Sequence, residues 1–168
     1  MDDPDDRGES RAPQLQDLLD LCQSLNREGA RYLLVGGFAV ILHGFVRSTK
    51  DVDFLVDPGE ENIRAVKKAM ATLPDNAAAL LADDEVQKYK VVRVADEIVV
   101  DLMAAACGVT YSEAALSGGG IESFNVRGVK IPVASKELLI RMKDTIRESD
   151  AVDVRFLRMR IDEEKRRG

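Results

Sequence analysis

The chain has 168 residues, enough for one domain with its own hydrophobic core. Hydrophobic residues make up 45% and charged residues 32%, as in ordinary soluble globular proteins, and no apolar run approaches the roughly 20 residues of a membrane span. The net charge of −6 argues against a broad nucleic-acid-coating surface, although it leaves room for a local basic cleft.

Residues 1–12 are charged and contain glycine and proline, which predicts a disordered acidic tail rather than a secretory signal. Residues 13–168 are expected to form a single domain. The only cysteines, Cys22 and Cys107, lie in apolar stretches without the spacing of a metal site. We therefore expect both to be buried, reduced thiols in a cytoplasmic protein.

The first predicted elements are a helix and a buried strand. Residues 13–28 carry apolar residues at helical spacing and are followed by Gly29, which predicts an amphipathic helix. The apolar residues 31–35 predict the strand. Gly36 and Gly37 follow at once and precede an apolar helical stretch. At such a junction the helix dipole and its free N–H groups favour an anion, and glycine lets a phosphate approach closely.

A second strand, Asp51–Val56, follows a polar connector and opens with two carboxylates. Because strand side chains alternate, Asp51 and Asp53 point to one side while Val52 and Phe54 point into the core. Two carboxylates held close together repel each other unless a cation lies between them. Oxygen ligands of this kind suit Mg²⁺, which completes its shell with substrate phosphates. The two features together predict a nucleotide-binding site.

The whole chain predicts an α+β (or α/β) fold, in which a small, mixed, largely antiparallel sheet is flanked by helices. After the second strand, the expected elements are a helix at 60–73, a short helix within 75–84, a hairpin of strands 87–94 and 97–103, a short helix within 104–116, a hairpin of strands 121–126 and 129–133, and, from about residue 135, C-terminal helices at 136–148 and 151–164. Asp101 is a lone acid in an otherwise apolar strand.

These features resemble the nucleotidyltransferase superfamily, which has the polymerase-beta-type fold. The family pattern is an apolar residue, Gly, Gly or Ser, a spacer, and then Asp-apolar-Asp/Glu-apolar. The residues Val35-Gly36-Gly37 and the segment 51–54 match this pattern, with thirteen residues between Gly37 and Asp51. The third family carboxylate would be Asp101.

A narrower resemblance covers residues 35–54, together with Lys143-Asp144 and the Asp150-x-x-Asp153 pattern in the C-terminal helices. These residues are similar to the small prokaryotic nucleotidyltransferases of the abortive-infection toxin group. The first segment also resembles small antibiotic-modifying nucleotidyltransferases.

The resemblance implies that a nucleoside monophosphate is transferred from a nucleoside triphosphate to a hydroxyl acceptor, with release of pyrophosphate. It implies that Asp51, Asp53 and Asp101 are catalytic and hold two Mg²⁺ ions, with Mn²⁺ as the alternative metal. The candidate nucleotide-binding residues are Gly36, Gly37, Arg47, Ser48, Lys50 and Lys143. The acceptor is open: a tRNA, a protein side chain or a small molecule such as an aminoglycoside would all fit. Because the chain is short, we expect the acceptor to bind against the C-terminal helices, a second subunit of a homo-oligomer or a partner protein, and no membrane is implied.

Each feature also has a plainer interpretation. The two glycines would allow close packing of a helix on a strand, and surface strands often carry Asp-x-Asp. His43 suits a core role as readily as a phosphate contact. The connector residues 47–50 and Lys143 would suit solvated surfaces equally well, and the basic stretch 155–167 is either an exposed helix or a surface for nucleic acid. The alternative function is a non-catalytic nucleotide-binding module, or a toxin–antitoxin partner that retains the fold.

Overall fold

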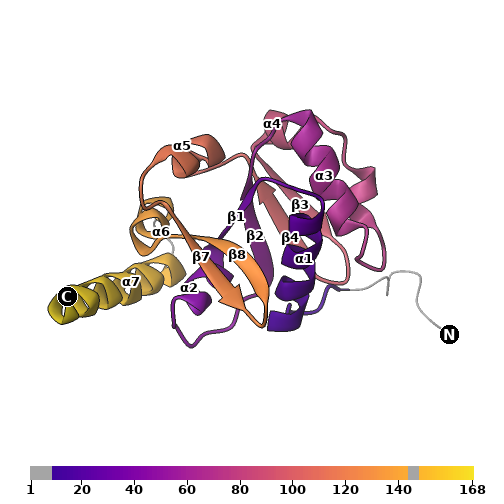
Figure 1. Ribbon diagram of the computed structural model, residues 1–168. Coiled ribbons are helices and arrows are strands. Elements are labelled where there is room, and N and C mark those ends of the chain that lie inside the picture. The colour runs from indigo at the N-terminus through magenta and orange to yellow at the C-terminus, as the bar shows by residue number, and fades with distance from the viewer. Residues whose placement is uncertain (1–8, 144–147) are drawn as a thin grey trace.

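The computed structural model describes residues 9–143 and 148–168. Its centre is a six-stranded sheet in the order β3-β4-β2-β1-β8-β7, with helices packed around it (Figure 1). The strands of this sheet are β1 (Tyr32–Val35), β2 (Asp51–Val56), β3 (Val91–Ala95), β4 (Val99–Met103), β7 (Ile121–Val126) and β8 (Val129–Ala134). A separate two-stranded sheet pairs β5 (Ala105–Ala106) with β6 (Val109–Thr110). The helices are α1 (Leu15–Arg27), α2 (Gly36–Leu42), α3 (Glu60–Met70), α4 (Glu85–Tyr89), α5 (Tyr111–Leu116), α6 (Lys136–Met142) and α7 (Glu148–Arg167), with a 3₁₀ turn at Ala77–Leu80.

The strand pairing confirms the predicted mixed, largely antiparallel sheet. The pairs β1–β2, β3–β4 and β7–β8 are antiparallel, whereas β2–β4 and β1–β8 are parallel. Strand β2 lies in the interior of the sheet, between β1 and β4. The two acids of β2 therefore have a neighbouring strand on each side.

The core is formed by the central strands and the apolar faces of the helices. All four residues of β1 are buried. Val52 and Phe54 are buried as well, which confirms that they point into the core. The ring of Phe54 meets that of Tyr32 edge to face, with centroids 5.4 Å apart, a favoured geometry for aromatic pairs. These contacts hold β1 and β2 together beneath the junction with α2.

The predicted boundaries before β3 and between α6 and α7 are wrong. Residues 87–89 belong to helix α4 rather than to a strand, and the chain reverses into β3 at Lys90, whose φ of 68° is left-handed. The residue pattern at 87–94 is compatible with a helix or a strand, and the tertiary packing places its first residues in helix α4. Helix α6 ends at Met142 rather than at residue 148, and α7 already begins at Glu148, so the break predicted at residues 149–150 is wrong. Ser135 does cap α6, since its hydroxyl accepts a hydrogen bond from the N–H of Leu138.

The two cysteines differ in their surroundings. Cys22 is buried as predicted, and burial raises the pKa of its thiol to about 12. The prediction for Cys107 is wrong, because this residue is exposed at the β5–β6 turn, where its Sγ donates to the carbonyl of Met142 at 3.0 Å. Cys107 and Gly108 both have positive φ angles and form the tight turn between β5 and β6.

Of the predicted disordered tail, residues 1–8 lie outside the described residues. Residues 9–12 lie against the β3–β4 turn, where Ser10 donates to the carbonyl of Asp96 at 2.7 Å and Arg11 pairs with Asp17 and Glu97. Among the described residues, no helix is both long and apolar enough to cross a membrane.

Candidate active site

Three carboxylates converge at one end of β2 and β4. In the parallel pairing of these strands, Asp53 lies directly opposite Asp101, and Asp51 lies two residues earlier on the same face of β2. One carboxylate oxygen from each residue lies within 4.8 Å of the other two. The structure therefore brings together the three acids that the sequence singled out.

Asp53 has a pKa that its surroundings shift strongly. Burial of its carboxyl group, and then the neighbouring charges of Asp51 and Asp101, raise its pKa to about 8. A negative charge at this position is unfavourable unless a cation compensates it. A hard divalent ion that accepts oxygen ligands fits the three acids on both charge and chemistry, and Mg²⁺ and Mn²⁺ are ions of this type.

A guanidinium already faces two of the acids. Arg93 on β3 lies opposite Asp101 in the antiparallel ladder and holds its carboxylate with two hydrogen bonds, Nε to Oδ1 at 2.9 Å and Nη2 to Oδ2 at 3.0 Å. The same Nη2 atom lies 3.3 Å from Oδ2 of Asp51. Sequence reasoning missed this residue. The one feature of the sequence that could have pointed to Arg93 is its position on the strand predicted to pair with the strand of Asp101.

The first glycine is needed because of the carboxylate beside it. Gly36 has a φ of 70°, and a Cβ atom built there would lie 2.0 Å from Oδ2 of Asp53. Helix α2 therefore begins against the acid, with no room for a side chain. At Gly37, a Cβ would lie 2.7 Å from the hydroxyl oxygen of Thr49. Both glycines therefore have the close-packing role that was the alternative to phosphate binding.

Two cavities meet at the acids. The carboxylate cavity, of about 250 Å³, is lined by all three acids, Arg93, Gly36 and Lys143, and at its other end by apolar residues that include Met103 and Leu139. The connector cavity, of about 570 Å³, is lined by both glycines, Asp51, Asp53 and the connector residues 47–50. Every predicted site residue lines at least one of the two cavities.

Lys143 is not on a solvated face, so that interpretation is wrong. Its side chain is 9% exposed, and Nζ lies 2.9 Å from Oδ2 of Asp153 and 3.4 Å from Oδ1 of Asp150. Arg47 in the connector donates to the same Oδ2 of Asp153. Both acids of α7 are buried. This network joins α7, the end of α6 and the connector beside the three carboxylates. The positive charge of Lys143 lowers the pKa of Asp53, against the larger effect of burial, which raises it.

Two further residues have structural roles. His43 is buried, donates from Nε2 to the carbonyl of Ala134 at 2.8 Å, and packs edge to face against Phe124. Burial lowers the pKa of its ring. The core interpretation of His43 is therefore confirmed. Thr49 donates to the carbonyl of Asp51 at 3.1 Å and so fixes the end of the connector. Asp144, which belongs to the predicted Lys-Asp pattern, lies outside the described residues.

Comparison with known proteins identifies a likeness in structure only. No protein-family model matches the chain, and no curated protein sequence does. The fold is similar to that of the lincosamide antibiotic adenylyltransferase LnuA, whose crystal structure was determined with lincomycin bound. The similarity has a TM-score of 0.55 and covers 88% of this chain and 98% of that chain, at 16% sequence identity. The chain therefore has a fold of the nucleotidyltransferase type.

Proposed function

We propose that the protein is a nucleotidyltransferase that transfers a nucleoside monophosphate from a nucleoside triphosphate to a hydroxyl acceptor in the cytoplasm. The observation that carries the proposal is the convergence of Asp51, Asp53 and Asp101 beside the start of α2, at the meeting point of two cavities. The nucleotidyltransferase-type fold supports it, since the structurally similar LnuA is an adenylyltransferase. The narrower resemblance to the abortive-infection toxin group rests on the sequence pattern alone.

In this proposal the three acids would hold Mg²⁺, with Mn²⁺ as the alternative, and the bound ions would neutralise charge on the triphosphate and on the attacking oxygen. The acceptor oxygen bonds to the α-phosphorus, the bond from that phosphorus to the bridging oxygen breaks, and pyrophosphate leaves with the electron pair. Asp101 would accept the hydroxyl proton. Arg47, Ser48 and Lys50 would orient the phosphates from the connector cavity.

The cations around the site have separate parts in this scheme. Lys143 borders both cavities, so its ammonium group lies where the triphosphate and the acceptor would meet. Arg93 holds Asp101 in a fixed orientation through its paired hydrogen bonds. In phosphoryl-transfer enzymes, positioning and electrostatic stabilisation account for most of the rate acceleration, because the protein itself contributes little covalent chemistry.

The test is to incubate the protein with each α-³²P-labelled nucleoside triphosphate, Mg²⁺ and cell extract, and to follow labelled acceptor and released pyrophosphate. The wild type is expected to form both products, and Asp53→Asn is expected to keep its fold by circular dichroism but to lose metal-dependent transfer. A near-wild-type rate in Asp53→Asn would refute the assignment of the acids. Nucleotide binding without any product would favour a non-catalytic binding module.

A further inference from the structure

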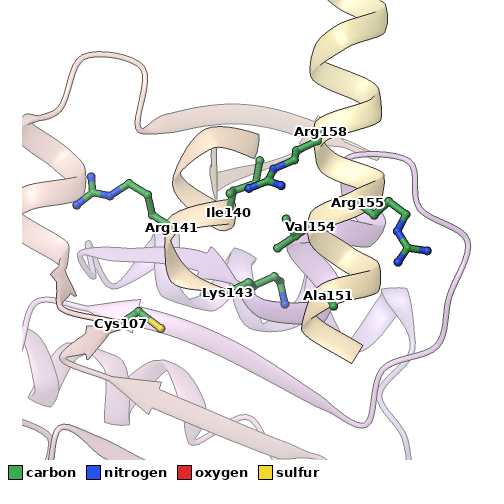
Figure 2. Close-up of a pocket in the computed structure, with 8 residues that line it drawn as sticks. All are labelled: Cys107, Ile140, Arg141, Lys143, Ala151, Val154, Arg155 and Arg158. Carbon is green, nitrogen blue, oxygen red and sulfur yellow. The ribbon is translucent and has the colours of Figure 1, made fainter. Parts of the chain in front are cut away.

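A third cavity opens beside the site, between helices α6 and α7. It has a volume of about 830 Å³, and we call it the α6–α7 groove. Figure 2 shows α7 on one side, α6 on the other, and Cys107 of the β5–β6 turn below them. The described residues that line the groove are Cys107, Ile140, Arg141, Lys143, Ala151, Val154, Arg155 and Arg158.

The groove is strongly cationic. Four of its eight described lining residues are Arg or Lys, and none of the eight is an acid. The chain as a whole has a net charge of −6, so a basic groove does not follow from the composition. Charge of one sign gathered in a cleft raises the local concentration of ligands of the opposite sign.

Three of these cations have no partner among the described residues. Arg141, Arg155 and Arg158 are exposed, and they form no ion pair or hydrogen bond with any described residue. Lys143 differs, since its ammonium group is held by two buried acids. The guanidinium groups are therefore available to a ligand without the loss of an existing ion pair.

The cations lie apart from one another around the groove instead of meeting at one point (Figure 2). On α7, Ala151, Val154 and Arg158 follow one another at helical spacing, and in Figure 2 Arg158 reaches over Ile140 of α6. Arg141 and Arg155 extend in opposite directions at the two sides of the groove (Figure 2). This spacing suits a chain of several charges better than a single compact anion.

The groove and the two cavities of the candidate active site share one lining residue, Lys143. A ligand that reaches Lys143 along the groove would thus have one end at the border of the carboxylate cavity.

We infer that the α6–α7 groove binds the phosphodiester backbone of a single-stranded nucleic acid and presents a hydroxyl of that strand to the three carboxylates, an inference that rests on the proposed function. Guanidinium groups match phosphate oxygens with paired, charge-assisted hydrogen bonds. No aromatic side chain is present among the described lining residues, so the strand is held through its backbone without base stacking. A polycationic acceptor such as an aminoglycoside would be repelled by these guanidinium groups.

The test measures binding of a fluorescein-labelled, mixed-sequence RNA of about 20 nucleotides, longer than the ~4–16 nucleotides that a single-strand site usually covers. Anisotropy is recorded in EDTA without nucleoside triphosphate, over a series of salt concentrations. The double variant Arg141→Gln/Arg158→Gln is expected to bind at least about ten-fold more weakly than wild type. Its plot of log affinity against log salt should be shallower by about 1.4, because each phosphate contact contributes about 0.7 for a single strand.

The matched control is Arg166→Gln/Arg167→Gln, which removes the same charge from the last turn of α7, outside the described groove lining. This variant is expected to bind RNA like the wild type. Equal losses in both double variants, or no RNA binding by the wild type, would overturn the inference. Equally tight binding of fluorescein-labelled polyglutamate, lost in the groove variant, would assign the groove to an acidic protein and overturn the nucleic-acid assignment.

The RNA assay contains no metal or triphosphate, so its result is independent of nucleotidyl transfer. RNA binding lost in the groove variant, in a protein that forms no labelled product with any nucleotide, would support the groove and reject the proposed enzyme. Transfer to another acceptor without RNA binding would reject the groove and leave the enzyme in place.

Discussion

At the scale of single residues, the candidate site is a balance between three carboxylates and the cations that face them. Asp53 is half-buried next to Asp51 and Asp101, and the partial burial and the neighbouring charges raise its pKa to about 8. Arg93 compensates Asp51 and Asp101 but makes no hydrogen bond to Asp53. The protein therefore holds an unfavourable charge pattern at this point, as functional sites often do.

The first prediction concerns the pH dependence of stability without metal. The pKa of Asp53 is about 8 when folded and 3.8 in its unperturbed state, so the folded protein binds the extra proton between these values. The stability due to Asp53 is complete below about pH 4, falls as the pH rises, and is lost above about pH 8. Urea unfolding in EDTA should show this decline for the wild type and a flatter profile for Asp53→Asn. Parallel profiles for the two proteins would contradict the assigned shift.

The second prediction concerns Arg93. Its guanidinium is paired with two of the carboxylates that would bind a metal ion, so it would compete with the ion for them. Arg93→Gln is expected to bind Mn²⁺ more tightly, by roughly ten-fold, because a competing positive charge beside Asp51 and Asp101 is removed. Electron paramagnetic resonance of free Mn²⁺ measures this affinity without nucleotide. Arg64→Gln is the control, since Arg64 pairs with the distant Asp83 and should leave the affinity unchanged. Unchanged or weaker binding in Arg93→Gln would show that Arg93 does not compete with metal.

At the scale of elements, the site depends on how closely α2 approaches β2. The helix begins at Gly36, directly after β1, and its first residue touches the carboxylate of Asp53 from the neighbouring strand. The connector then returns to β2, where Thr49 and the backbone of Asp51 close the loop. Short connections between β1, α2 and β2 thus place glycine backbone beside the acids without a long loop.

The third prediction tests this approach by replacing glycine. Gly36→Ala is expected to lower stability by more than the ~1–3 kcal/mol of left-handed backbone strain, because the new Cβ would also collide with Asp53. Gly29→Ala is the matched control: Gly29 has a similar φ of 66°, but its added Cβ meets open space. The free energy of unfolding of each variant is measured in urea, and the difference between the two losses gives the cost of the collision. Equal losses would mean that the carboxylate moves aside freely.

At the scale of the whole molecule, the C-terminal helix is joined to the centre of the sheet through buried charges. Asp153 of α7 accepts from both Arg47 in the connector and Lys143 after α6. Phe156 of α7 packs edge to face on Phe45, with centroids 4.5 Å apart. The same helix forms one wall of the α6–α7 groove, so the network sets the position of a groove wall relative to the acids.

The fourth prediction concerns this network. Asp153→Ala is expected to destabilise the fold by about 3 kcal/mol, because the buried Lys143 loses its nearer partner. Adding Lys143→Met should recover much of the loss, since the uncompensated charge is then gone. Asp83→Ala, which removes the two ion pairs of a half-exposed carboxylate near the surface, should change urea unfolding less than Asp153→Ala does. Equal stability of the single and double Asp153 variants would show that Lys143 remains compensated by Asp150.

The order of most elements and the shared face of Asp51 and Asp53 were predictable from the amino-acid pattern. These features follow from local periodicity, which acts between residues close in the chain. The glycine junction and Asp101 were also recognisable, although their convergence was inferred by resemblance to a family.

Only the tertiary structure decided which cations face the acids. A two-residue turn at 95–96 would have paired Arg93 with Ile98, whereas β3 and β4 pair Ala95 with Val99 and so place Arg93 opposite Asp101. The partners of Lys143 and the α6–α7 groove likewise depend on how α6 and α7 pack against each other. Local periodicity shows which residues of a strand share a face, but the register of β3 and β4 depends on the geometry of their turn, and helix docking depends on burial between segments far apart in the chain.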